Sequence, residues 1–135
     1  NSISIHVRRG DYLLKTNNNH NIDLKKYYLT AIEKTSIFFK DPKYFIFTDD
    51  PLWVAENFTL DYSFTVVDIN RCTESFYDMH LMSLCKCNII ANSSFSWWGA
   101  WLNDKEDKII YAPKSWFKDK SICTDNLIPN SWNII

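Results

Sequence analysis

Two adjacent arginines near the start of the chain are the side chains best suited to chemistry. Arg8 and Arg9 follow an alternating apolar run, and Gly10 and Asp11 come directly after them. A guanidinium presents paired donors in a planar fork and keeps its charge, so it matches phosphate well. We interpret this motif as an anion site rather than as two surface charges. From sequence alone, Asp11 has three open roles: orienting an arginine, acting as a base, or capping the turn.

His6 lies two positions before the arginines, within the same apolar run. A lone histidine in such a strand is usually a core residue, but its polar tip would lie near the end of the strand. Spacing alone leaves both interpretations open. The run Arg9-Gly10-Asp11 also matches the cell-adhesion tripeptide, which is short enough to arise by chance.

Two further polar runs follow apolar segments. Asp50 precedes Pro51, which is typical of a capping carboxylate before the first helical residue. The pair Asp49-Asp50 could bind a metal instead, but we favour a site without one. The run from Asn92 to Ser94 opens a helix, where free backbone N–H groups and the helix dipole attract anions. The alternative is that these serines only cap the helix.

The periodicity predicts alternating strands and helices. Strands are expected at 3–7, 44–47, 64–67, 88–91 and 108–111, and helices at 24–39, 51–57, 76–86 and 95–102. We expect two of the three tryptophans Trp97, Trp98 and Trp101 to enter the core, and an irregular tail after 112. This alternation indicates an α/β fold with a doubly wound, mostly parallel, Rossmann-like sheet.

In such sheets, ligands bind beyond the carboxyl ends of the strands. Those ends carry arginines, carboxylates and serines, a set that suits a nucleotide diphosphate: Arg8, Arg9, Asp49, Asp50, Asp68, Asn92, Ser93 and Ser94. The sequence has neither a GxGxxG nor a Walker loop, so a dinucleotide or P-loop site has no support.

Composition narrows the class of protein. With 135 residues and 46% apolar content, the chain can form one domain with a core. A net charge of -1 argues against nucleic acid as a partner, and no apolar run is long enough to span a membrane. The four cysteines have no CxxC pairing, so we expect reduced structural thiols. The abrupt start on a strand suggests a fragment whose N-terminal half is missing.

Several segments in order resemble the α-1,2-fucosyltransferases, glycosyltransferase family 11. Residues 6–12 are similar to the first donor-binding motif of that family, and 47–50 to its short acidic motif. Residues 77–102 carry its most specific signature, and 113–117 resemble its closing segment. The resemblance covers almost the whole chain.

The resemblance implies the nucleotide-binding half of a GT-B-like enzyme. Residues 1–135 would form a single α/β donor-nucleotide-binding domain, with the acceptor side in the missing half. The implied reaction moves L-fucose from GDP-β-L-fucose to a galactose 2-hydroxyl of a glycan, with inversion and with neither a metal nor another cofactor. The alternative from a different class is a non-catalytic nucleotide-sugar or glycan-binding module.

The resemblance also implies roles at the phosphates. Arg8 would bind the β-phosphate and act in catalysis, with Arg9 supporting the motif. Ser94, together with Ser93 and the amide of Phe95, would hold phosphate.

Other roles concern the base and the acceptor. His6 and Asp78 would approach the guanine, and Asp50 would support the base or ribose side. Residues 13–16 lack the carboxylate that some relatives use as a general base. Asp11 is therefore the best candidate in this chain, although the base could equally lie in the missing half.

The abundance of Asn, Lys and Ile suggests an AT-rich genome. We therefore expect a bacterial cytoplasmic enzyme that makes surface polysaccharide. A eukaryotic counterpart would work in the Golgi lumen and carry its anchor in the missing region.

Overall fold

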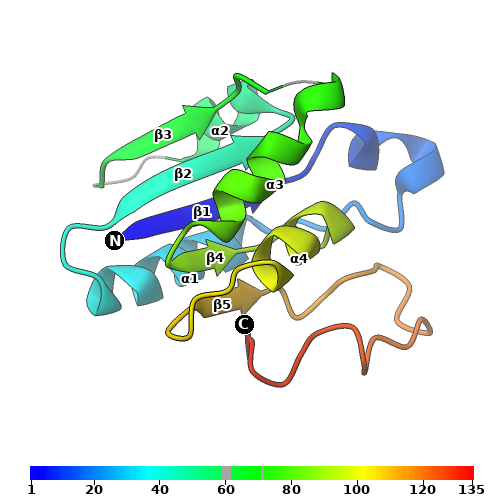
Figure 1. Cartoon of the computed structure of the whole chain (residues 1–135). Helices are drawn as coiled ribbons and strands as arrows, with labels where there is room; N and C mark the ends of the chain where they lie inside the picture. The colour runs from blue at the N-terminus through cyan, green and yellow to red at the C-terminus, as the bar shows by residue number, and fades with distance from the viewer. Residues whose placement is uncertain (59–61, 71) are drawn as a thin grey trace.

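The computed structural model describes residues 1–58, 62–70 and 72–135. Across this part of the chain, strands and helices alternate (Figure 1). The strands are β1 (Ser2–Val7), β2 (Lys43–Thr48), β3 (Phe64–Val67), β4 (Cys87–Ile89), β5 (Ile109–Ala112) and β6 (Asn133–Ile134). The helices are α1 (Lys25–Phe38), α2 (Pro51–Asn57), α3 (Phe76–Ser83) and α4 (Ser94–Trp101), with short 3-10 turns at Asp11–Leu13, Lys15–Asn17 and Cys72–Glu74.

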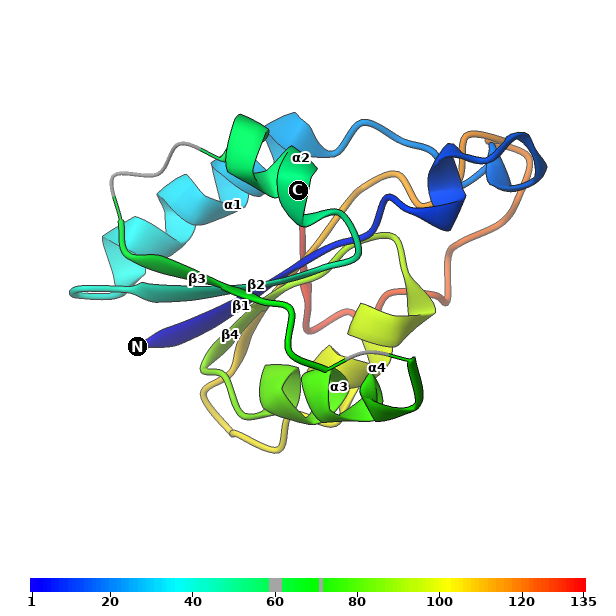
Figure 2. The same cartoon turned by 90° about the horizontal axis from the view of Figure 1, so that it is seen from above.

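The strands form one parallel sheet in the order β3-β2-β1-β4-β5-β6. Helices α1 and α2 cover one face, and α3 and α4 cover the other (Figure 2). The predicted doubly wound α/β fold is confirmed. The strand order reverses direction between β1 and β4, and such a switch point is where open parallel sheets bind ligands.

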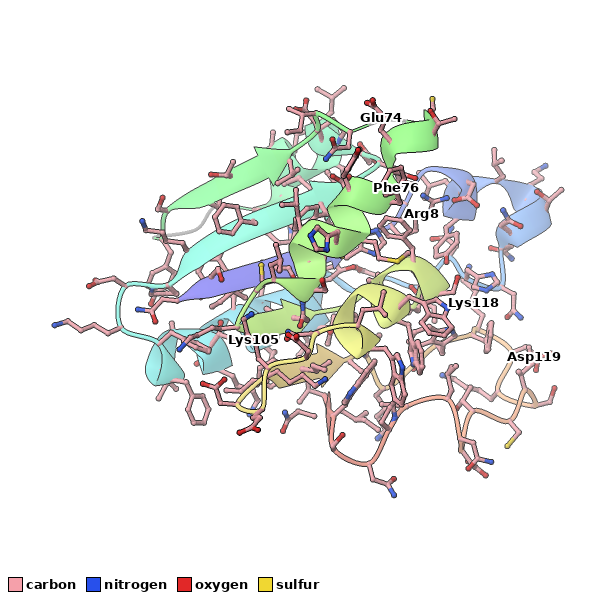
Figure 3. The ribbon with its side chains drawn as sticks, viewed as in Figure 1. Arg8, Glu74, Phe76, Lys105, Lys118 and Asp119 are labelled. Atoms are coloured by element: carbon pink, nitrogen blue, oxygen red, sulfur yellow. The ribbon has the colours of Figure 1, made fainter. Side chains whose placement is uncertain are left out.

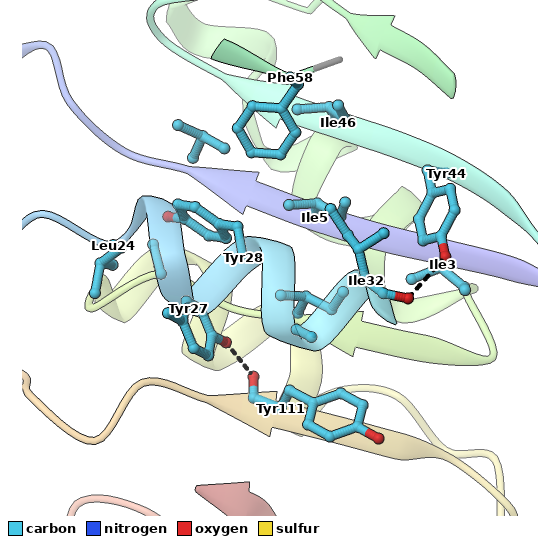
Figure 4. Close-up of a cluster of buried hydrophobic side chains, with 14 of the residues drawn as sticks. Ile3, Ile5, Leu24, Tyr27, Tyr28, Ile32, Tyr44, Ile46, Phe58 and Tyr111 are labelled. Atoms are coloured by element: carbon cyan, nitrogen blue, oxygen red, sulfur yellow. Dashed lines mark hydrogen bonds between the residues drawn. The ribbon is translucent and has the colours of Figure 1, made fainter. Parts of the chain in front are cut away.

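The core beneath α1 is built from alternate residues of β1 and one stripe of the helix. Ile3 and Ile5 are fully buried against this helix (Figure 4). The hydroxyl of Tyr27 lies 2.8 Å from the carbonyl oxygens of both Ile90 and Tyr111. Because this hydroxyl is buried, those contacts satisfy it and tie α1 to the β4 and β5 side of the sheet.

The opposite face of the sheet carries a buried polar network. The Asn88 side chain donates 2.7 Å hydrogen bonds to the Ser4 hydroxyl and to the Met82 carbonyl. Asn103 in turn donates to Oδ1 of Asn88 at 2.8 Å. These bonds fix the C-terminal end of α3 over β1 and β4, and thereby the position of the pocket-facing end of that helix.

Two predictions about the second half of the chain are wrong. The tail is not wholly irregular, because Asn133 and Ile134 pair with β5 as a short edge strand. Trp97 packs against Trp132, but Trp98 and Trp101 are 49% and 51% exposed. The reason is that α4 turns its small residues inward: Ser96, Gly99 and Ala100 are buried.

All four thiols are free, as expected. Cys85 and Cys87 are buried, whereas Cys72 and Cys123 are exposed, so only the first two have a packing role. Within the described residues, no helix is long and apolar enough to cross a membrane.

Candidate functional site

A pocket of about 610 Å³ opens beyond the carboxyl ends of β1, β2, β3 and β4. Figure 3 shows Arg8 where β1 leaves the sheet, with Lys105 toward the opposite end of the strands. The lining is mixed polar and apolar: His6, Arg8, Asp11, Tyr12, Phe47, Thr48, Asp49, Pro51, Val67, Asp68, Asn70, Cys72, Ser75, Asp78, Ser93, Ser94 and Phe95. Five of the eight predicted rim residues line this pocket: Arg8, Asp49, Asp68, Ser93 and Ser94. The other three, Arg9, Asp50 and Asn92, are absent from the described lining.

The arginine pair and the aspartate pair follow the register of the two strands that carry them. Val7 of β1 is opposite Thr48 of β2. One step further, Arg8 Nη1 lies 3.2 Å from Asp49 Oδ2, and Arg9 Nε lies 3.1 Å from Asp50 Oδ2. Strand pairing thus creates two adjacent ion pairs.

The two arginines have different surroundings. Arg8 lines the pocket and lies near the Tyr12 ring, whose centroid is 5.7 Å from Cζ. Arg9 places its guanidinium 4.3 Å from the ring centroid of Trp53 on α2. Asp50 accepts a 3.0 Å hydrogen bond from the amide of Trp53, as an N-cap does. Neither Arg9 nor Asp50 is among the described residues that line the pocket. A contact of either residue with a nucleotide-sugar ligand therefore remains a prediction.

Asp11 is the second carboxylate beside Arg8. Its Oδ1 lies 2.7 Å from Nη2 of Arg8, and Asn17 donates to its Oδ2 at 3.2 Å. The contact at Oδ1 is an ion pair without hydrogen-bond alignment, because within the described residues that atom has no hydrogen-bond partner. Because Asp11 Oδ1 is buried beside Arg8, a ligand can reach it only if that guanidinium moves.

His6 is both a buried residue and a pocket residue. Its side chain is packed against Phe95, with ring centroids 5.5 Å apart. Burial and the nearby Arg8 lower the pKa of His6 to about 3, so the imidazole is neutral. Its Nδ1 has no hydrogen-bond partner in the described part of the chain. A buried nitrogen without a partner is costly, so this atom is suited to a ligand.

The N-terminus of α4 faces the same pocket. Ser93 is the N-cap, but its hydroxyl makes no capping hydrogen bond. Asn92 holds this turn by donating 2.9 Å bonds to the carbonyls of His20 and Trp116. The early amides of α4, including that of Phe95, have no intrahelical partner by helix geometry. Hydroxyls, amides and Arg8 together form an anion site.

Helix α3 contributes Asp78, in its first turn, to the pocket lining. Asn70, from the connection after β3, donates a 2.7 Å hydrogen bond to Asp78 Oδ1. Burial raises the pKa of Asp78, while the bond from Asn70 opposes that shift. We call the part of the pocket around Asp78 its acidic end, whereas the part around Arg8 holds one cation flanked by Asp11 and Asp49.

Sequence reasoning gave no role to several side chains of the pocket, Tyr12 and Asn70 among them. Asp49 was predicted to lie on the rim, as a carboxylate for base or ribose donors or as a metal ligand. The structure pairs it with Arg8, and its place one residue beyond Thr48 in the β1–β2 register is the signal for that pairing. The hydroxyl of Tyr12 donates to the Asn92 carbonyl at 3.1 Å. The sequence placed Tyr12 in the same motif as the arginines but indicated no separate role for it. Asn70 lies in a connection with no periodicity. Within the described residues, no cluster of three or more His, Cys, Asp or Glu could hold a metal ion.

A parallel α/β domain with a polar pocket at its switch point has the architecture that is typical of nucleotide-binding α/β proteins. The sequence profile of the family described as "Glycosyl transferase family 11" matches residues 1–135. The chain belongs to glycosyltransferase family 11.

Two curated relatives come from Escherichia coli. The chain is 40% identical over 134 residues to "O-antigen biosynthesis glycosyltransferase WbnK", covering 98% of this chain and 44% of that protein. It is 38% identical over 136 residues to "Alpha-1,2-colitosyltransferase", covering 98% of this chain and 47% of that protein. The chain therefore spans less than half the length of these relatives. No solved structure matches significantly.

Proposed function

We propose that this chain is the donor-binding part of an α-1,2-fucosyltransferase. The reaction would transfer L-fucose from GDP-β-L-fucose to a galactose 2-hydroxyl of a glycan. The observation that carries the proposal is that the Arg8 guanidinium and the open N-terminus of α4 line one pocket at the switch point. Family membership and both relatives support glycosyl transfer as the chemistry.

The two ends of the pocket suggest how the donor lies. The diphosphate would occupy the end with Arg8, Ser93 and Ser94, where charge and hydroxyl donors gather. The guanine would extend toward Asp78. His6, neutral and buried beside Phe95, would contribute an uncharged hydrogen bond rather than a charge.

Catalysis in this proposal depends on stabilising the departing diphosphate. Negative charge grows on GDP as the sugar becomes oxocarbenium-like, and Arg8 and the α4 amides face that charge without a metal. Removing one such preorganised donor typically slows a reaction by about 10²–10³.

Asp11 is the proposed base within this chain. It lies 2.7 Å from Arg8, so a base role requires the diphosphate to take over that guanidinium. The Oδ1 atom would then accept the proton of the acceptor hydroxyl while the glycosidic bond forms with inversion. A base outside this chain is the competing assignment.

The relatives suggest a setting and a second donor sugar. The name of WbnK includes O-antigen biosynthesis, which favours a bacterial surface polysaccharide as acceptor and the cytoplasm as location. The other relative is named for colitose, so GDP-colitose is the alternative donor to GDP-fucose. Both sugars would use the same diphosphate site.

The test is calorimetric titration of this chain with GDP-β-L-fucose and with GDP-colitose in EDTA. We expect metal-free binding that weakens at least about tenfold in Arg8→Ala, because hydrogen bonds to charged groups are strong. Lys34→Ala, which removes an exposed cation of α1, is the charge-matched control. Binding that needs a divalent metal, or that is equal in Arg8→Ala, would refute the proposal.

A further inference from the structure

The acidic end of the pocket is built from two side chains on separate segments. Asn70 comes from the connection after β3, and Asp78 from the first turn of α3. Asn70 Nδ2 donates to Asp78 Oδ1 at 2.7 Å, and both residues line the pocket. Each is partly buried.

This hydrogen bond leaves most of the carboxylate available. In the described part of the chain, Asn70 is the only side chain that donates to Asp78. A carboxylate has about four lone-pair sites, so Oδ2 and one site on Oδ1 remain for a ligand. Because Asn70 holds Oδ1, the carboxylate plane is fixed before any ligand arrives.

A fixed carboxylate discriminates among purines. Guanine presents N1–H and a 2-amino group side by side on one edge, and a carboxylate accepts from both. Hypoxanthine has N1–H but lacks the 2-amino group, and adenine presents an unprotonated N1 that repels a carboxylate. Sites built to accept from a particular N–H reject analogues that lack it.

We propose that Asn70 is a positioning residue that orients Asp78 and thereby sets the preference of this pocket for guanine. The inference rests on the proposed function, because it takes the bound ligand to be a purine nucleoside diphosphate. Asn70 itself acts through Asp78 and need not touch the base.

A purely structural role makes a different prediction. Asn70 and Asp78 also link the β3–α3 connection to the start of α3, and an acidic residue in a first turn is favourable for any helix. If that link were the whole role, its loss would lower stability and weaken all nucleotides equally. The ratio between nucleotides separates the two roles.

The first experiment compares GDP, IDP and ADP binding by calorimetry. Wild type should bind GDP at least about tenfold more tightly than IDP, and ADP more weakly still. Asn70→Leu, which keeps the bulk and removes the donor, should bring the GDP-to-IDP ratio within about threefold. Thr73→Ala, an exposed neighbour outside the described lining, should keep the wild-type ratio. If circular dichroism shows that Asn70→Leu does not fold, Asn70→Ala replaces it in the same comparison.

The second experiment tests the carboxylate directly. In Asp78→Asn, Asn70 would bond the new amide oxygen and leave the amide N–H₂ facing the base. That variant should lose GDP affinity and gain affinity for xanthosine diphosphate, whose purine carries an oxygen in place of the 2-amino group. A merely structural aspartate would give no such gain.

The outcomes separate the two proposals. Absence of GDP binding by folded wild-type protein would overturn the proposed function. GDP binding with the same GDP-to-IDP ratio in wild type and Asn70→Leu would overturn only the role of Asn70. A lowered ratio in Asn70→Leu with unchanged circular dichroism would support it.

Discussion

Asp49 holds Arg8 at the edge of the pocket: its Oδ2 atom lies 3.2 Å from Nη1 of the guanidinium. The other oxygen of the same carboxylate accepts a 2.9 Å hydrogen bond from the backbone amide of Arg9. One side chain directly after β2 therefore fixes both the backbone turn after β1 and the side chain that faces the pocket. Preorganisation of this kind lowers the ordering cost of binding.

Asp49→Ala should weaken GDP binding by about threefold to tenfold, because Arg8 then keeps only its contact with Asp11 and is less ordered before the ligand binds. Calorimetry at constant ionic strength measures the change. Asp107→Ala is the control, since this 75% exposed carboxylate contacts only Lys86, at 3.8 Å, within the described residues. Tighter GDP binding by Asp49→Ala would mean instead that Asp49 competes with the diphosphate for Arg8.

Gly10→Ala should weaken GDP binding through Asp49. A Cβ at Gly10 would lie 2.7 Å from Asp49 Oδ2, so the carboxylate must move away. The double variant Gly10→Ala, Asp49→Ala should then bind GDP no more weakly than Asp49→Ala alone, since contacting residues are not additive. Thr73→Ala, at an exposed residue outside the described lining, is the control. Full additivity of the two changes would contradict this coupling.

The stability of the domain should fall as the pH drops below 6.5. The pKa of His6 is lowered from 6.5 to about 3, so the unfolded chain takes up a proton that the folded chain refuses. Each pH unit between these values should therefore cost about 1.4 kcal/mol of unfolding free energy. Urea unfolding at several pH values measures the slope.

Comparison with His6→Gln isolates the contribution of His6. In that variant, the unfolding free energy should change less steeply with pH, by the equivalent of about one bound proton. Equal slopes in wild type and His6→Gln above pH 5 would show that His6 is protonated in the folded state.

Tyr27→Phe should destabilise the domain by about 1–3 kcal/mol, because it leaves a buried carbonyl without its donor. The hydroxyl lies 2.8 Å from the carbonyl oxygens of Ile90 and Tyr111. Chemical denaturation measures the loss, and Tyr62→Phe, at a side chain 39% exposed, is the control. A variant as stable as wild type would mean that water or the backbone replaces the bond.

Most of the fold could be predicted because local patterns and tertiary structure agree. The strand over 64–67 has the bounds of β3, and the helix over 51–57 has those of α2. Strand β6 could not be predicted, because Asn133 and Ile134 have no periodicity and become a strand only by pairing with β5. The prediction for the tryptophans of α4 was wrong because it was based on their aromatic side chains. The spacing of the small residues Ser96, Gly99 and Ala100, which face inward, was the better signal.

The rim of the site was predictable, but the direction of its side chains was not. Strand ends placed both arginines and both aspartates together. Which member of each pair enters the pocket depends on the β1–β2 register and on Trp53, which packs against Arg9. The sequence alone reveals neither this register nor the contact between Trp53 and Arg9. The position of Asn70 could not be predicted either, because its hydrogen bond to Asp78 joins two segments whose separation in the folded domain has no signal in the sequence.

The most direct test of the account is the affinity for GDP compared with GMP, measured by calorimetry in EDTA. If Arg8 contacts the β-phosphate, wild type should bind GDP at least about tenfold more tightly than GMP, and Arg8→Ala should lose most of that difference. The same GDP-to-GMP ratio in wild type and Arg8→Ala would place the diphosphate elsewhere and contradict the central claim.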